Sequence, residues 1–172
     1  MVYNKKMKFF SITTIIALLF FLALAIWNSV SWNQEKLYGS IQIYEDWRGN
    51  IQLAQHSLNQ KGAPSFQIYA DIARARGFSN SGIYYSSNQD VFSRLTSLST
   101  ELELEISGLM TKNPALLDED QDFLANQLEW VLKNLSINLE EVSSSQVEEM
   151  RQTLNFNYIK YAKIPSEKVE VE

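Results

Sequence analysis

A run of nineteen residues near the N-terminus, residues 9–27, contains no charged residue, no proline and no glycine. Charge is absent from Ser11 through Gln34. A helix of this length spans about 28 Å at about 1.5 Å per residue, which matches the hydrocarbon core of a bilayer. A helix can cross lipid because it satisfies its backbone polar groups internally. The pattern therefore predicts one membrane-spanning helix over residues 9–27.

The charges on either side of this run predict its orientation. Lys5, Lys6 and Lys8 precede it, whereas the first charges beyond it are Glu35 and Lys36, which have opposite signs. Short positive flanks stay in the cytoplasm. We therefore expect a single-pass protein of the cell membrane, with residues 1–8 in the cytoplasm and the C-terminal part outside.

A cleaved signal peptide is the alternative interpretation of the same run. Ala23-Leu24-Ala25 resembles a cleavage site after a basic start and an apolar core. The apolar run continues past this site into Ile26-Trp27, which favours a retained signal-anchor. Both interpretations carry the remainder of the chain across the membrane.

Apolar residues then recur at spacings of three and four, which indicates amphipathic helices. The first helix follows the apolar run to a turn at residues 61–64, and the second runs from Pro64 to about Arg76, closed by Gly77. Residues 77–88 are expected to form a loop. The stripe of the first helix is Leu37, Ile41, Tyr44, Trp47, Ile51, Ala54 and Leu58, and that of the second is Phe66, Tyr69, Ile72 and Ala73.

Three further helices are predicted after this loop. One begins near Ser87 with a capping pattern at residues 87–90, and the next begins at Asn113-Pro114, with Asn as the cap, and extends to Val142. A second capping pattern, residues 145–148, opens the last helix, which ends at Ile164-Pro165. The three stripes are Val91, Leu95, Leu98, Leu102, Ile106 and Leu109; Phe123, Leu124, Leu128, Val131, Leu135, Leu139 and Val142; and Val147, Met150, Leu154, Tyr158 and Tyr161.

These elements predict an all-α protein. Residues 28–165 would form an antiparallel helical bundle of about four long helices, because helices joined by short turns bury their stripes against one another. Residues 166–172 form a charged tail.

Composition narrows the function classes. The 172-residue chain has no cysteine, which excludes disulfides, thiol catalysis and cysteine-bound metals. Without the three lysines before the apolar run, 12 basic residues stand against 20 acidic ones, a balance of −8. An acidic surface argues against nucleic acid as a partner.

Few residues suggest chemistry. His56 is the only histidine and has no metal-ligating or acid–base partner at a suitable spacing. Carboxylates in residues 118–122, together with Glu129, match the ligand spacing of a calcium loop, but Phe123 occupies the position that requires glycine. An acidic helix start is favoured, since the helix dipole attracts negative charge there. We assign no catalytic, cofactor-binding or metal-binding residue and expect no enzyme activity.

The order of the elements resembles the LemA family. Trp32-Asn33 corresponds to an aromatic–Asn pair just after the anchor, and Trp47 lies at about the family's spacing beyond it. Pro64 lies near the family's first turn, and the stretch Asn113-Pro114-Ala115-Leu116 opens a late helix, as a Tyr-Pro and a Leu do in the family. Ile164-Pro165 stands where the family has Phe-Pro, whereas the paired arginines before the proline turn are missing. The resemblance implies a membrane anchor and a helical bundle and names no reaction.

The expected function is therefore binding. We expect a non-enzymatic, membrane-anchored scaffold or accessory protein of the bacterial envelope, in contact with the lipid bilayer and a membrane or envelope protein, and homo-oligomerisation is left open. Aromatic residues favour interfaces, so Trp47, Tyr84 and Tyr85 are the expected partner contacts. The alternative is a sensory input module that signals through a partner membrane protein, with Ser11, Thr13 and Thr14 facing the partner's helix.

Overall fold

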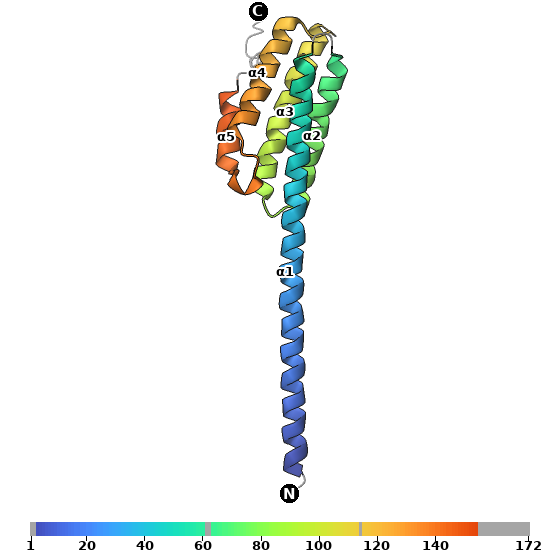
Figure 1. The fold of residues 1–172 in the computed structure, drawn as a ribbon, viewed down its shortest axis with the longest axis vertical. Helices are drawn as coiled ribbons and strands as arrows, with labels where there is room; N and C mark the ends of the chain where they lie inside the picture. Colours follow the sequence, from blue (N-terminus) through green and yellow to red (C-terminus); the bar gives the residue numbers. More distant parts are fainter. Residues whose placement is uncertain (1–2, 61–62, 114, 155–172) are drawn as a thin grey trace, which may run out of the picture. The chain divides into compact units, whose positions relative to one another are not determined.

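The computed structural model describes residues 3–60, 63–113 and 115–154, and their side chains from Thr14 onward. Within these ranges the protein has five α-helices, one short 3-10 helix and no strand (Figure 1). The chain divides into two compact units, Met1–Tyr38 and Gly39–Glu172. The prediction of an all-helical chain with one long apolar N-terminal helix is confirmed.

Helix α1, Tyr3–Leu58, contributes to both units. In the first unit its large apolar side chains, among them Leu18, Phe21 and Ile26, are exposed. This part of α1 is long and apolar enough to cross a membrane, a property that anchors share with N-terminal signal sequences.

In the second unit, α1 buries the stripe that its sequence predicts. The rings of Tyr44 and Trp47 stack with centroids 5.9 Å apart and planes 16° apart. Trp47 Nε1 donates a hydrogen bond of 2.9 Å to Ser99 Oγ. Leu37 and Ile41, at the start of the stripe, are only partly buried. The fully covered members are Tyr44, Trp47, Ile51, Ala54 and Leu58.

Helix α2 runs from Ser65 to Tyr85, so the prediction of a helix end at Gly77 and a loop over residues 77–88 is wrong. The buried stripe continues past Gly77 through Ser79 and Gly82. These residues are small or polar, so a hydropathy pattern does not detect them, although they keep the helical spacing of three and four. The stripe also lies on a different face from the predicted one, because Phe66 is exposed.

Helix α3, Gln89–Lys112, packs against α2 along the length of both helices (Figure 1). Its predicted stripe, from Val91 to Leu109, is buried as expected. Its N-cap residue is Asn88, whose side chain makes no capping hydrogen bond, so the predicted capping pattern is wrong.

Three contacts define the relative direction of α2 and α3. Tyr69 contacts Glu103, and Ser79 contacts Thr96, so the contacts move back along α2 as they advance along α3. Near the end of α2, Gly82 lies against the buried ring of Phe92. The two helices are therefore antiparallel.

Helix α4, Asp118–Asn134, is shorter than predicted at both ends. It begins four residues after Pro114, a residue outside the described ranges, and Asn113 Oδ1 accepts a bond from Ala115 N instead of capping the helix. Between Asn134 and the next α-helix, which begins at Ser144, the chain is irregular apart from η1, a 3-10 helix over Leu139–Glu141. Leu139 and Val142 are nevertheless buried, so the stripe continues without the helix.

Side chains from α1 explain why α4 ends where it does. Arg48 donates 2.7 Å and 2.9 Å hydrogen bonds to the carbonyl oxygens of Leu132 and Leu135, and Tyr44 Oη donates a 2.6 Å bond to Ser136 O. The last carbonyls of a helix lack partners within it. Here α1 supplies those partners, together with a positive charge that favours a helix C-terminus.

Helix α5, Ser144–Thr153, is capped by Ser143, two residues before the predicted cap at Ser145. Ser143 Oγ, not Ser145 Oγ, accepts the capping bond from Gln146 N at 3.1 Å. Two ion pairs, Arg94 to Glu148 and Glu101 to Arg151, show that α5 runs parallel to α3. The buried residues Val147, Met150 and Leu154 match the predicted stripe, and the remaining predicted features, Tyr158, Tyr161, Ile164-Pro165 and the tail 166–172, lie outside the described residues.

Candidate functional site

Trp47 is fully buried, so its prediction as an exposed partner contact is wrong. It fills the space between α1 and α3, where Ser99 accepts its indole N–H. Ser99 in turn donates to Leu95 O at 2.9 Å, so every polar atom of this arrangement is paired. Trp47 therefore holds the second unit together and is not available to a partner.

Tyr84 and Tyr85 are the last two residues of α2, and they are 72% and 69% exposed. Ile137, between α4 and η1, is 77% exposed. Sequence reasoning missed Ile137 because it assigned residue 137 to the interior of a helix. We call these three residues the proximal surface, after the end of the second unit at which α1 enters it.

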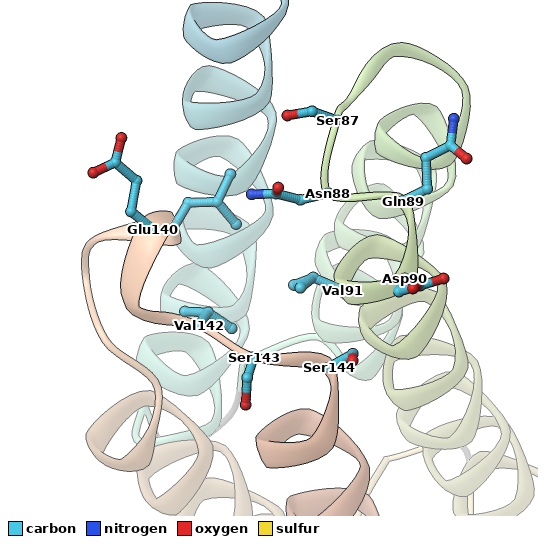
Figure 2. Close-up of a pocket in the computed structure, with 10 residues that line it drawn as sticks. Ser87, Asn88, Gln89, Asp90, Val91, Glu140, Val142, Ser143 and Ser144 are labelled. Atoms are coloured by element: carbon cyan, nitrogen blue, oxygen red, sulfur yellow. The ribbon is translucent and has the colours of Figure 1, made fainter.

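A cavity of about 490 Å³ lies between two segments that follow Tyr85 and Ile137 in the chain (Figure 2). Residues 87–91 line one side, and Leu139, Glu140 and residues 142–144 line the other. Val91 and Val142 face one another across it, and Asp90 and Glu140 point away from it (Figure 2). The α2–α3 connection and the η1–α5 connection therefore meet at one end of the second unit.

That end is also where α1 enters the second unit, because Tyr44 is bonded to Ser136 next to Ile137. We call it the proximal end. The opposite, distal end contains the start of α2 at Ser65, whose Oγ accepts a 3.1 Å bond from Leu116 N. The eighteen steps from Phe66 to Tyr84 separate the two ends by about 27 Å of helix.

A second groove, of about 280 Å³, lies at the distal end between α2 and α3. Phe66 lines it and is 70% exposed. Tyr69 Oη donates a 2.8 Å bond to Glu103, which fixes this side of the groove. The same hydrogen bond raises the pKa of the Tyr69 phenol, as does the charge of Glu103. The other residues lining the groove are Ser107, Met110 and Thr111.

Two carboxylates of α2 and α3 make contacts within or between these helices. Asp71 is buried and accepts bonds from Gln67 at 3.0 Å and from Arg74 at 2.7 Å, on its own helix. Glu103 pairs with Arg76 at 2.5 Å, which ties α2 to α3. Sequence reasoning missed both, since a helical stripe does not show which charged residues are covered.

The residues weighed for chemistry lie apart from these surfaces. His56 is exposed and contacts Gln60, two residues past the end of α1, at 2.8 Å. Residues 118–122 form the acidic first turns of α4, and Glu129 pairs with Lys133 at 2.6 Å. Among the described residues, no three His, Asp or Glu side chains form a group that could hold a metal ion. The distal groove and the proximal surface offer apolar and aromatic side chains for contact.

No family model, curated protein or solved structure matches this chain.

Proposed function

We propose that this protein is a single-pass, non-enzymatic membrane protein whose helical bundle binds a protein partner in the bacterial envelope. One observation carries the proposal: the two parts of α1 differ in how they are covered. The large side chains of its apolar part are exposed, whereas its stripe from Tyr44 to Leu58 is buried. Exposed apolar surface of this extent requires cover, and lipid provides it.

The orientation follows from Lys5, Lys6 and Lys8 before the apolar part. Positive flanks of this kind stay in the cytoplasm, which places the bundle outside. In this proposal the second unit is an antiparallel bundle of four long helices, formed by α2, α3, α4 and the second part of α1. The layout and the resemblance to the LemA family agree with such an anchored bundle.

The distal groove is the surface that we propose for the protein partner. Phe66, Tyr69 and Met110 are the residue types that interfaces favour, and the bond from Tyr69 to Glu103 holds one of them in place. Tyr84 and Tyr85, the contacts expected from sequence, remain the alternative site for that partner. They lie at the opposite end of α2 from Phe66.

Two measurements on the full-length protein test this function. Intact-mass analysis of protein from the membrane fraction should give a chain that still contains residues 1–25, and a mass that begins at Ile26 would show cleavage and refute the anchor. A photo-crosslinking residue at position 66 should capture one dominant envelope protein in cells. The same residue at Leu53, an exposed apolar position on α1, is the control.

The crosslinking result discriminates between surfaces. Capture from position 66 that Met110→Ser abolishes, with helix content unchanged, would support the distal groove. Capture from position 84 alone would move the site to the proximal surface. Equal capture from positions 53 and 66 would refute a specific site.

A sensory input module is the second candidate. The observation that favours it is the bonding of Tyr44 and Arg48 to the end of α4, which couples α1 to another helix of the bundle. Such a module needs a partner helix in the membrane. Changing Ser11, Thr13 and Thr14 to Leu should then abolish co-purification of that partner, and unchanged co-purification would refute the module.

A further inference from the structure

The distal groove presents apolar side chains in a volume that is small for a ligand pocket. Phe66, which is 70% exposed, lines it together with the partly buried Tyr69 and Met110. Its volume of about 280 Å³ is below the roughly 300–1,000 Å³ of pockets that bury a small molecule. The groove therefore suits a few side chains of a larger partner.

Two hydrogen bonds connect the start of α2, next to the groove, with the start of α4. Leu116 N donates a 3.1 Å bond to Ser65 Oγ, and Gln121 Nε2 donates a 2.9 Å bond to Leu116 O. Phe66 directly follows Ser65 in α2. Consecutive Cα atoms are about 3.8 Å apart, so the Cα atom of Asp118 lies within about 8 Å of that of Leu116. The first turns of α4 therefore lie at the same end of the second unit as the groove, although they do not line it.

The first turns of α4 carry an excess of negative charge. The basic residues nearest in the sequence, Lys61 and Lys112, are outnumbered by four acidic ones. Within residues 3–60, 63–113 and 115–154, no ion pair involves these four carboxylates. Leu117, the N-cap residue of α4, is 55% exposed beside them. The four acidic residues are Asp118, Glu119, Asp120 and Asp122.

These charges limit the possible occupants of the groove. A second copy of the chain would be opposed by like charge, because 12 basic residues stand against 20 acidic ones beyond the apolar run. Among the residues that the structure describes, no three His, Asp or Glu side chains could hold a metal ion. Lys and Arg have the complementary charge, and their apolar stems can cover exposed apolar surface. A basic protein segment therefore fits this end best.

We propose that the distal groove binds a basic segment of the envelope partner. An apolar side chain of that segment packs on Phe66 and Met110, and its Lys or Arg side chains lie against the first turns of α4. The inference rests on the proposed function, which assigns this groove to a protein partner. Charges at the edge of an interface mainly speed association, and salt screens them, so binding should weaken as salt is added.

Selection from a displayed library of random peptides tests the inference on the full-length protein in detergent micelles. One variant neutralises the four carboxylates of α4, and a control variant neutralises four exposed carboxylates elsewhere, so both change the net charge equally. Circular dichroism checks that the helix content of both variants is unchanged. The first variant carries Asp118→Asn, Glu119→Gln, Asp120→Asn and Asp122→Asn, and the control carries Glu45→Gln, Asp90→Asn, Glu140→Gln and Glu149→Gln.

Peptides enriched on the parent protein should combine Lys or Arg with a large apolar residue. They should bind the control variant as well as the parent protein, bind the first variant several-fold more weakly, and lose binding to Phe66→Ser. Raising the salt concentration from about 0.1 M to about 1 M shortens the screening length from about 10 Å to about 3 Å. This change should weaken binding to the parent protein without any substitution.

The outcomes separate this inference from the proposed function. Enriched peptides without basic residues, or peptides that bind both fourfold variants equally, would overturn the basic partner. Absence of any peptide whose binding depends on Phe66 would overturn the groove as a peptide site. Capture of one dominant envelope protein from position 66 in cells would, in either case, leave the proposed function intact. Absence of that capture would refute the partner at this groove, and the inference with it.

Discussion

The two glycines in the second half of α2 should respond in opposite directions to the same substitution. A β-carbon on Gly77 would meet nothing within 4 Å, and Gly77 is exposed. A β-carbon on Gly82 would lie less than 3.0 Å from three ring atoms of Phe92. Phe92 is fully buried, so its ring has no free space to enter.

Gly77→Ala should stabilise the protein by about 0.5–1 kcal/mol, because alanine costs less conformational entropy than glycine in a helix. Gly82→Ala has the same gain, but it also forces extra volume into a packed core, at a cost of about 1–3 kcal/mol. The gain from replacing glycine by alanine in a helix is the same in both variants and cancels in the comparison. Their free energies of unfolding should therefore differ by about 1–3 kcal/mol, with Gly82→Ala the less stable.

Urea denaturation of the full-length protein in detergent micelles, followed by circular dichroism, measures both variants against the parent protein. Gly82→Ala should destabilise a Phe92→Leu protein less than it destabilises the parent protein, since the ring that clashes is gone. A Gly82→Ala protein as stable as Gly77→Ala would refute the close packing of α2 on α3.

Two further predictions concern the junction of α1 with α4. Arg48→Met should lower the free energy of unfolding by about 1–3 kcal/mol, because the carbonyls of Leu132 and Leu135 lose a charged donor. The control Lys133→Met removes an exposed ion pair and should lower it by less than about 0.5 kcal/mol. Equal effects in urea denaturation would contradict the capping role. Burial raises the pKa of the Tyr44 phenol above 10.0, and the nearby Arg48 opposes this. The stability that the protonated Tyr44 phenol contributes is therefore complete below pH 10.0 and is lost as pH rises further. Tyr44→Phe should reduce this loss, and melting curves recorded from below pH 10.0 upward would measure it.

The hydropathy pattern was sufficient for the long elements with strong stripes. The apolar part of α1, its buried stripe from Tyr44 to Leu58, and the stripe of α3 all follow from spacing alone. In these segments the large apolar residues recur every three or four positions, and burying them is the dominant gain on folding. Local signals and tertiary packing agree there, so the prediction holds.

The second half of α2 shows what the sequence could not reveal. Gly77 and the serines after it are typical of a loop, yet the segment is helical because α3 packs against its small residues. Gly82 is buried where a β-carbon would clash with Phe92, and buried Ser79 accepts a hydrogen bond from Thr96. Helix propensity is a weak preference that such packing outweighs.

The sequence by itself determined that the chain is helical, that it carries one uncovered apolar segment, and that its chemistry is acidic and free of cysteine. Only the tertiary structure decided that Trp47 is buried against Ser99, that α4 ends at the donors of Arg48, and that Ile137 joins Tyr84 and Tyr85 at one end. Spacing along a helix fixes which residues share a face. Which faces are covered depends on partners that are distant in the sequence, and that information lies in the packing.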